Sequence, residues 1–347
     1  MDGTSEITLD VDGRCNFCTQ AQKALKEIEL EKPNLDKWIK KIKEDGKGNK
    51  YDVLCGLSGG VDSSTALVNA VRVHGLRVLC FTMDNGYNDP RADSNILQIV
   101  ETLKVPLYRY VLDLQKFADL QGAYLKAGVI NVEVAYDHLL MAATYELAST
   151  YKIGWVLSGG NISSESVMPS EWSFRSSDLV NIKSIYKWAI GKRLKGVKGS
   201  FPLCGLLRWN YYRWWKKIKV FYLLDYINYN RKESEQMLIE KYNFQSTGEK
   251  HCENQFTKWY QNFYLFTKWN IDKRKCHFSS LINSNQMTRQ EAMFLLTASP
   301  EYPQLGIEAK VMGYPKRRHE DFKVDRWFGR ISKIVKFFRQ WKFMGIS

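Results

Sequence analysis

Long hydrophobic runs are missing from this sequence. No stretch approaches the roughly 18 to 20 uncharged apolar residues that a membrane-spanning helix needs, and the longest candidate, residues 220–229, contains Asp225. There is also no leading apolar segment followed by a small-residue cleavage site, which argues against a secretory signal. We therefore expect a cytoplasmic, soluble protein that approaches a membrane at most from the outside.

Cysteines are few and do not pair in an obvious way. Seven in 347 residues, an odd number, do not resemble a disulfide framework. Cys15 and Cys18 form half of a zinc site, but structural zinc sites commonly take two such pairs and no second Cys-x-x-Cys exists. The distant candidates for completing the site are Cys252 with Cys276 and His251 with His277. Two reduced cysteines in a surface turn are the simpler interpretation, and a Zn²⁺ site is the alternative.

Positive charge is in excess. Lys and Arg number 51 against 37 Asp and Glu, a formal net charge of +14. Such a balance indicates an anionic partner, whether nucleic acid, a phosphorylated substrate or a membrane surface, and charge alone does not choose among them. With 44% hydrophobic residues the chain is globular, and its length suits one large domain with elaborations or two domains.

A turn rich in glycine and serine occupies residues 51–64, Tyr-Asp-Val-Leu-Cys-Gly-Leu-Ser-Gly-Gly-Val-Asp-Ser-Ser. Its apolar start suits a buried strand, and Gly59 and Gly60 allow backbone N–H groups to approach an anion closely. Ser63 and Ser64 begin the next helix, whose N-terminus also favours negative charge. The pattern predicts a pyrophosphate-binding loop, with an ordinary strand-to-helix turn as the alternative.

One carboxylate distinguishes this loop from the common nucleotide-binding loop. That loop has the pattern Gly-x-x-x-x-Gly-Lys-Ser/Thr, and here no lysine follows the glycines. Asp62 stands in its place, and a carboxylate beside phosphates requires a cation between them, most simply Mg²⁺. The loop therefore suits a nucleotide whose α–β phosphate bond breaks, with pyrophosphate as the leaving group.

Strand and helix patterns alternate from Tyr51 to about Gly160. The expected strands are 53–57, 77–83, 107–112 and 154–157, and the expected helices are 63–73, 94–103, 114–126 and 132–150. This alternation predicts an α/β fold with a doubly wound parallel sheet and ligands at the carboxyl ends of the strands. Asp84 ends the second strand, close to an expected adenine or ribose. Gly159, Gly160 and Asn161 follow the fourth strand, where the glycines permit close approach and Asn161 offers both a donor and an acceptor.

The second half is mostly helical in pattern, and aromatic and basic residues crowd together at 208–219 and 326–342. Such segments bind single-stranded nucleic acid or anionic membranes, but helices with inward rings and solvated charges are commoner, and we favour that interpretation. Site-like polar residues concentrate elsewhere in this half, and they suit an anionic substrate. They are Lys250, His251, Lys273, Arg274 and His277. Either histidine alone is more often structural. We expect three parts: 1–49, 50–165 and 166–347.

The sequence resembles a known family at several motifs. Ser58-Gly-Gly-Val-Asp-Ser63 is similar to the signature of the N-type ATP pyrophosphatases, or PP-loop proteins, whose fold is that of the adenine nucleotide alpha hydrolases. From about Ile7 to about Leu296 the chain resembles the N-acetyl sugar amidotransferases of O-antigen and nonulosonic acid biosynthesis. The supporting segments are Asp12–Cys18, Ser58–Ser64, Leu157–Ser166, Pro169–Trp172, Phe256–Gln261, Ile271–Ile282 and Gln286–Ala292.

The resemblance implies conversion of a sugar acetamido group to an acetamidino group in surface polysaccharide biosynthesis, with ATP, Mg²⁺ and ammonia. Ammonia would come from a separate HisH-like glutaminase, similar to that of imidazole glycerol phosphate synthase, with a HisF-like partner as a further option; no nucleic acid partner is expected. The pyrophosphate would lie on Ser58, Gly59, Gly60, Ser63 and Ser64. Catalytic roles would fall to Asp62, which holds Mg²⁺, to Ser63 and to Asn161. The nucleotide-linked sugar would bind Lys250, His251, Lys273, Arg274 and His277.

Two features depart from this family, and two other functions compete. Family members usually carry another Cys-x-x-Cys just upstream of Cys15, so either the start at Met1 is internal or the zinc ribbon is incomplete. Cys252 and Cys276 also stand where other residues are expected. A PP-loop tRNA sulfur transferase would use the same adenylation but needs a persulfide cysteine, and Cys55 and Cys80 lie inside expected strands. A non-catalytic nucleotide-binding protein is the other alternative.

Overall fold

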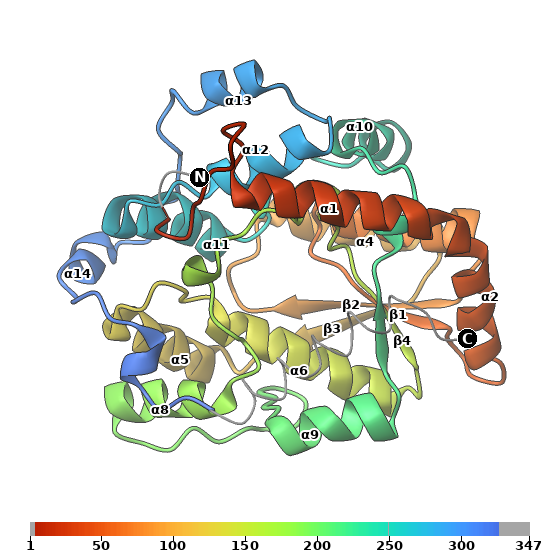
Figure 1. Ribbon diagram of the computed structural model, residues 1–347. Coiled ribbons are helices and arrows are strands. Elements are labelled where there is room, and N and C mark those ends of the chain that lie inside the picture. The colour runs from red at the N-terminus through yellow and green to blue at the C-terminus, as the bar shows by residue number, and fades with distance from the viewer. Residues whose placement is uncertain (1–3, 249, 326–347) are drawn as a thin grey trace.

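A five-stranded parallel sheet organises the chain (Figure 1). The computed structural model describes residues 4–248 and 250–325. The strands are β1 (Val53–Gly56), β2 (Val78–Asp84), β3 (Leu107–Val111), β4 (Trp155–Leu157) and β5 (Lys219–Phe221), in the order β3-β2-β1-β4-β5. From β1 the strands are added outward through β2 to β3, the chain then returns to form β4 beside β1, and β5 completes the sheet at its other edge. The order reverses between β1 and β4, so a ligand crevice is expected at the carboxyl ends of these two strands.

The helices complete the described part of the chain. They are α1 (Asn16–Glu31), α2 (Leu35–Asp45), α3 (Val61–Val68), α4 (Pro90–Leu103), α5 (Leu114–Ala127), α6 (Val134–Thr150), α7 (Ile162–Glu165), α8 (Leu179–Ile190), α9 (Leu206–Asn210), α10 (Arg231–Tyr242), α11 (Gln255–Trp259), α12 (Arg274–Asn283), α13 (Arg289–Leu295) and α14 (Glu308–Met312). Three of them, α3, α9 and α11, continue as wider π-type turns over 69–73, 211–215 and 260–268.

Two hydrophobic layers enclose the sheet because neighbouring strand residues point to opposite faces. Val53 and Cys55 of β1 pack with the side chains of α2, α3, α4 and α10, whereas Leu54 packs with those of α5, α6, α8 and α11. All three strand residues are fully buried. A sheet covered on both faces accounts for the continuous apolar runs of the strands.

One buried histidine ties α6 to the second half of the chain. His138 Nδ1 lies 2.6 Å from the carbonyl oxygen of Ser176 and donates to it, and Nε2 accepts from the backbone N–H of Cys204 at 3.2 Å. Both ring nitrogens are used by the neutral imidazole. Burial lowers the pKa of His138 to about 4, so the ring stays neutral in the folded protein at physiological pH.

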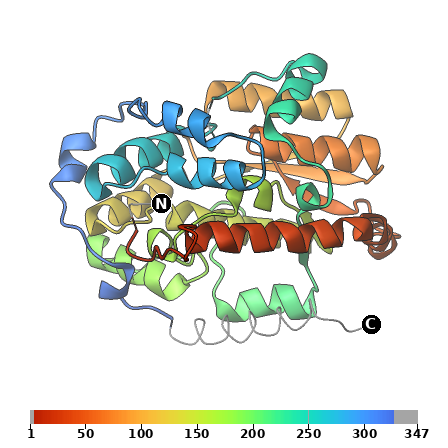
Figure 2. The ribbon, with the colours of Figure 1, turned by 45° about the horizontal axis from the view of Figure 1, so that its top comes forward.

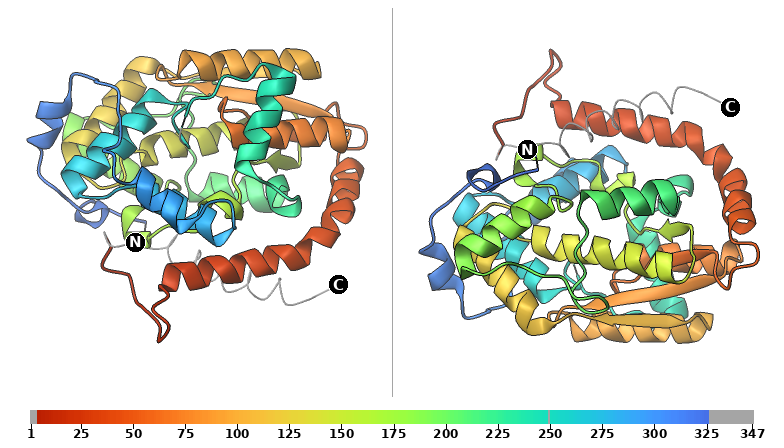
Figure 3. Two further views of the ribbon diagram at one scale, coloured as in Figure 1. Left: turned by 90° about the horizontal axis from the view of Figure 1, so that it is seen from above. Right: turned by 90° about the horizontal axis from the view of Figure 1, so that it is seen from below.

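The N-terminal helices lie along the outside of the sheet. Figure 2 shows α1 crossing the molecule beside α12, and Figure 3 shows α2 turning around one end of the sheet. The chain changes direction at Pro33, between the two helices. Asp45 at the end of α2 accepts a hydrogen bond from the indole Nε1 of Trp155 at 3.0 Å, which fixes α2 against β4.

The α/β fold with a parallel sheet is confirmed, and the four predicted strands match β1 to β4 closely. The fifth strand was missed. β5 spans three residues, Lys219–Phe221, and its residues 219 and 220 are exposed, so it has neither the length nor the apolar run of a central strand. At the start of α13, Thr288 and Glu291 form a capping box. The predicted basic aromatic segment 326–342 lies outside the described residues.

Candidate nucleotide-binding site

A cavity of about 940 Å³ opens where the strand order reverses. Its walls come from the loop after β1, the loop after β4, the first turns of α6, and the segments 247–261 and 273–277. Four of the five predicted second-half residues therefore meet the predicted loops in one place. Lys250, His251, Lys273 and His277 all line the cavity, as do Ser58, Gly60, Asp62, Ser63, Gly159 and Gly160.

Glycine is required at Gly59 by two independent constraints. Its φ is +78°, in the region that favours glycine, and a Cβ there would lie 2.3 Å from the carbonyl oxygen of Ala92 in α4. Next to it, Ser63 Oγ accepts from the N–H of Ser58 at 3.3 Å, and Ser58 Oγ accepts from the N–H of Gly60 at 3.3 Å. The N–H groups of this loop thus donate to serine hydroxyls, and a bound anion would replace those hydroxyls as the acceptor.

The loop after β4 packs directly on the loop after β1. A Cβ on Gly159 would lie 2.7 Å from the backbone nitrogen of Ser63, and one on Gly160 would lie 3.3 Å from Ser158 Oγ. Gly160 lies against Ser158 of its own loop, whereas Gly159 allows the two loops to touch each other. This contact joins the ends of β1 and β4 into a continuous floor for the cavity.

Lys250 bridges two carboxylates at this floor. Its Nζ lies 2.7 Å from Asp62 Oδ2 and 2.9 Å from Glu165 Oε1, and it donates to Ser164 Oγ at 2.5 Å. Tyr229 donates a hydrogen bond from its hydroxyl to the other oxygen of Asp62. The predicted need for a cation beside Asp62 is thus met by an ammonium group in this structure.

The protonation states follow from these contacts. Burial opposes ionisation of Asp62, but Lys250, the Tyr229 hydroxyl and Arg231 outweigh it and lower the pKa of this carboxyl. Burial likewise opposes the charge of Lys250, and the two carboxylates outweigh it and raise its pKa. The Tyr229 pKa rises because of burial and the neighbouring Asp62 charge, so its hydroxyl remains a donor. An ionised, paired carboxylate stands in the loop at neutral pH.

A second buried ammonium faces the cavity without a carboxylate contact among the described residues. Lys273 is 9% exposed, and its Nζ contacts the thioether sulfur of Met168 at 2.7 Å. Burial lowers its pKa. A desolvated cation whose polar contact is a weak acceptor is well placed to bind an anionic group of a ligand.

Carboxylates line another part of the wall, at the start of α6. Glu133 precedes the helix and accepts a hydrogen bond from the Thr257 hydroxyl, and Asp137 lies one turn further. Burial raises the pKa of Glu133, and the charge of Asp137 adds to this effect. Both are positioned to accept hydrogen bonds from a ligand, so the cavity offers cationic and acidic walls to one molecule.

Several predicted site residues lie outside the cavity wall. Asn161 is buried and caps α7, with Oδ1 accepting from the N–H and hydroxyl of Ser164, each at 2.9 Å. Asp84 accepts from the N–H of Gly86 at 3.0 Å and lies 3.4 Å from Arg109. Arg274 pairs with Asp272 at 2.7 Å. Gly59 and Ser64 stand behind the loop, where Ser64 is buried. The contacts of Asn161, Asp84 and Arg274 give these three residues structural roles.

The histidines and the cysteine pair also have defined places. His251 and His277 lie with ring centroids 5.4 Å apart, and burial lowers the pKa of both, most strongly for His277. Cys15 Sγ and Cys18 Sγ are 3.4 Å apart. Within residues 4–248 and 250–325, no three His, Cys, Asp or Glu side chains gather as a metal site. The described residues thus give no support to the predicted zinc site.

Sequence reasoning missed Tyr229, Glu165 and Glu133. Tyr229 lies in a segment that showed only an apolar run, and Glu133 lies at the start of an expected helix. Glu165 could have been found, because it follows the glycines after β4 by only a few residues. Tyr229 contacts Asp62 and Glu165 contacts Lys250, and only the folded chain brings these side chains together. Glu133 and Glu165 line the cavity.

One segment of the chain matches a known protein family. Residues 253–323 match a family described as LPS biosynthesis protein WbpG-like, C-terminal domain. This segment contains Lys273 and His277 of the cavity wall. A search of curated proteins finds no match. No helix in the described ranges is long and apolar enough to cross a membrane.

Solved structures show only distant similarity. The NH3-dependent NAD synthetase from Campylobacter jejuni subsp. jejuni NCTC 11168 is 20% identical over 38% of this chain and 56% of its own length, with a TM-score of 0.29. The NMN synthetase from Francisella tularensis is 15% identical over 61% and 99%, TM-score 0.29. The U34-tRNA thiolase NcsA from Methanococcus maripaludis is 13% identical over 84% and 89%, TM-score 0.36.

The alignment thus spans little more than half of the NAD synthetase. The order β3-β2-β1-β4-β5 of the parallel sheet establishes the α/β fold. The family match agrees with the resemblance that the sequence motifs predicted. This match to the WbpG-like family of LPS biosynthesis proteins covers residues 253–323 of the chain.

Proposed function

We propose that this protein is an ATP-dependent amidotransferase. It adenylates the acetamido carbonyl oxygen of an N-acetyl sugar and replaces that oxygen with ammonia, giving an acetamidino group. The observation that carries the proposal is the meeting of two unlike anion-binding features in one cavity. The glycine and serine loop with Asp62 lies at the strand-order reversal, and the buried ammonium of Lys273 lines the same cavity.

The triphosphate of ATP fits the loop after β1. The N–H groups of Ser58 and Gly60 now bind side-chain hydroxyls within the loop at 3.3 Å, and these weak neutral contacts are easily exchanged for phosphate oxygens. Ser63 stands at the start of α3, whose N-terminus favours the charge of a departing pyrophosphate. The loop therefore holds the leaving group.

Mg²⁺ fits the donor set beside this loop. Asp62 and Glu165 already share one cation, the ammonium of Lys250, at 2.7 and 2.9 Å. Mg²⁺ is usually held by one or two carboxylates together with substrate phosphates, so these two residues suffice on the protein side. When bound there, Mg²⁺ would neutralise phosphate charge and stabilise the leaving pyrophosphate.

The proposed reaction balances in two steps. The carbonyl oxygen of the acetamido group attacks the α-phosphorus of ATP, an O–P bond forms, and the α–β bond breaks to release pyrophosphate. Ammonia then forms a bond to the activated carbon, the C–O bond breaks, AMP leaves with that oxygen, and one proton is released. Gly159 and Gly160 line the cavity beside the loop, where the reacting carbon is proposed to lie. Glu133, whose pKa burial raises, suits the released proton.

Lys273 gives the substrate its proposed orientation. A buried ammonium with a thioether contact gains a charge-assisted hydrogen bond when a sugar carboxylate or nucleotide diphosphate arrives. The neutral imidazoles of His251 and His277 extend the same wall. The ligand class that fits is therefore an anionic acetamido sugar, and ammonia is proposed to come from a separate glutaminase.

The competing tRNA sulfur transferase is less well supported. Cys55 and Cys80 are buried inside β1 and β2, and burial raises the pKa of Cys55 to about 12. Among the described residues, the cysteine that lines the cavity is Cys276, which is buried and whose pKa is also raised by burial. A persulfide-forming cysteine needs an accessible thiolate, which these environments oppose.

The test is a substrate comparison with purified protein. ATP, Mg²⁺ and ammonium are incubated with a UDP-linked acetamido sugar, with tRNA, or with neither, and AMP and pyrophosphate are measured. Product formation only with the sugar supports the proposal, and formation only with tRNA supports the sulfur transferase. Absence of turnover with either indicates a nucleotide-binding protein. Glutamine is expected to fail as nitrogen donor until a glutaminase is added.

A further inference from the structure

One region of the chain carries positive charge without any acidic residue. Residues 179–224 contain no Asp or Glu, although the whole chain has 37. Eleven Lys and Arg residues fall in the same region: Lys183, Lys187, Lys192, Arg193, Lys195, Lys198, Arg208, Arg213, Lys216, Lys217 and Lys219. Of these, Lys219 lies 3.8 Å from Asp45 of α2. The region comprises α8, the following loop, α9 with its π-type turn, and β5.

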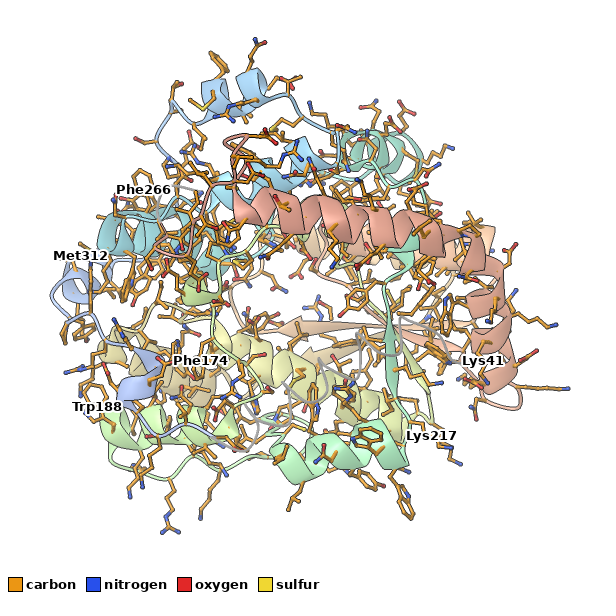
Figure 4. The ribbon with its side chains drawn as sticks, in the orientation of Figure 1. Lys41, Phe174, Trp188, Lys217, Phe266 and Met312 are labelled. Carbon is orange, nitrogen blue, oxygen red and sulfur yellow. The ribbon has the colours of Figure 1, made fainter. Side chains whose placement is uncertain are left out.

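These elements lie on one side of the molecule. α8 and α9 both lie below the sheet in Figure 1, and the right-hand view of Figure 3 looks onto them. In Figure 4, Trp188 of α8 and Lys217 beyond α9 are labelled at the two ends of this side. We call the exposed side chains of residues 183–217 the basic face.

Apolar side chains stand out from the basic face, contrary to the sequence prediction that its rings pack inward. Leu207 is 87% exposed, Trp214 72% and Trp215 79%. Exposure at this level is unusual for consecutive tryptophans, because each would bury a large apolar area in a protein core. Within this segment, Trp209 and Tyr212 pack inward, as predicted.

Two other rings anchor this segment to the core. Tyr212 is buried and stacks on Tyr145 with ring centroids 5.6 Å apart, and Trp209 meets Tyr145 edge to face at 5.0 Å. With the segment fixed through Tyr212 and Trp209, the π-type turn over 211–215 presents Trp214 and Trp215 outward. Turns of this kind are frequent at functional positions. The outward tryptophans are thus held by a packed base.

We propose that the basic face docks on an anionic phospholipid surface. Tryptophan prefers the headgroup level of a bilayer, lysine and arginine attract anionic headgroups, and leucine enters the acyl boundary. Single-stranded nucleic acid would use the charges and the rings but would leave Leu207, the most exposed of the three, without a contact. The complementarity of charge and the exposed aliphatic chain favour the lipid surface. This inference does not depend on the proposed reaction.

The test measures binding of the full chain to vesicles by cosedimentation. Phosphatidylcholine vesicles are compared with vesicles that also contain phosphatidylglycerol. Two double variants probe the face: Trp214→Ser with Trp215→Ser, and Lys216→Glu with Lys217→Glu. Matched controls elsewhere are Lys37→Glu with Lys40→Glu on α2, which make the same charge change, and Phe294→Ser on α13, where Phe294 is also exposed.

Wild-type protein is expected to bind only the phosphatidylglycerol vesicles, and to be released by high salt. Each double variant on the face is expected to lower binding by about tenfold or more, while the controls change it by less than about twofold. The inference is overturned if wild-type protein ignores both vesicles. It is equally overturned if the control variants lose as much, or if the face variants bind like wild type. Preference for a single-stranded RNA over the vesicles would assign the face to nucleic acid instead.

Discussion

Replacing Lys250 tests whether Asp62 and Glu165 form a cation-binding position. In the folded protein this group lies 2.7 Å from Asp62 and 2.9 Å from Glu165. Breaking a buried ion pair by removing one partner costs about 3 to 5 kcal/mol. Glu165 has 36% of its side chain exposed, so solvent screens part of its charge. For Lys250→Ala we therefore expect a loss of roughly 2 to 3 kcal/mol in the free energy of unfolding.

Mg²⁺ should restore this loss if it binds the same carboxylates. Urea unfolding of Lys250→Ala is measured in EDTA and in excess MgCl₂. At a free Mg²⁺ concentration 100 times its dissociation constant, the gain would be about 2.7 kcal/mol. In the absence of ATP phosphates, wild-type protein should gain little, because its own ammonium occupies the position between Asp62 and Glu165.

A matched control uses an ion pair at the other edge of the sheet. Arg77 binds Asp52 at 2.6 Å, and the Asp52 side chain is 4% exposed. Arg77→Ala should also destabilise the protein, without any recovery in MgCl₂, since only one carboxylate, that of Asp52, remains there. Recovery of both variants, or of neither, would refute the idea that Asp62 and Glu165 form the cation position.

Three further predictions concern the loop, the substrate wall and pH. Gly59→Ala should lower the free energy of unfolding by roughly 2 to 4 kcal/mol and abolish ATP binding measured by calorimetry, because backbone strain and a clash combine. The control Gly191→Ala has a similar φ but open space around it, so it should lower the free energy of unfolding by only about 1 to 2 kcal/mol. Lys273→Met should raise KM for an anionic sugar about 10- to 100-fold while the Kd for ATP stays unchanged, and an equal loss for both ligands would contradict its assignment. Neutral His138 has a pKa of about 4 in the fold against 6.5 when unfolded, so its contribution is present above pH 6.5 and is lost as pH falls toward 4. Between pH 6.5 and 4, the free energy of unfolding of wild-type protein, measured with urea, should therefore fall by roughly 3 kcal/mol more than that of His138→Gln. An equal fall for both proteins would show that His138 does not titrate as described.

Most of the sheet was predictable because its information is local. A strand buried on both faces has a continuous apolar run, as in Val78–Asp84, and an amphipathic helix has apolar residues that recur every three to four positions. β5 has no such trace. It is an edge strand of three residues, and only its pairing with β4, through Val156 and Val220, makes it a strand. Long-range pairing of this kind is not written in the segment itself.

The site was predictable where backbone chemistry decides it and less so where side chains compete. Glycines after β1 and β4 indicated close approach, which the contact of Gly159 with Ser63 explains. Asn161 was predicted as catalytic from residue type, but in the structure its amide caps α7. Arg274 was predicted to hold an anion and instead pairs with Asp272 two residues earlier. A residue type suggests a role, and the nearest partner decides whether that role is open.

The most direct test of the proposed reaction follows one oxygen atom. The acetamido carbonyl of the sugar substrate is labelled with ¹⁸O, and AMP, pyrophosphate and sugar product are analysed by mass spectrometry after a single turnover with ATP, Mg²⁺ and ammonium. Attack of that oxygen on the α-phosphorus predicts one ¹⁸O in AMP and none in pyrophosphate or in the amidino sugar. Unlabelled AMP with ¹⁸O retained in the sugar or found in inorganic phosphate would contradict the account.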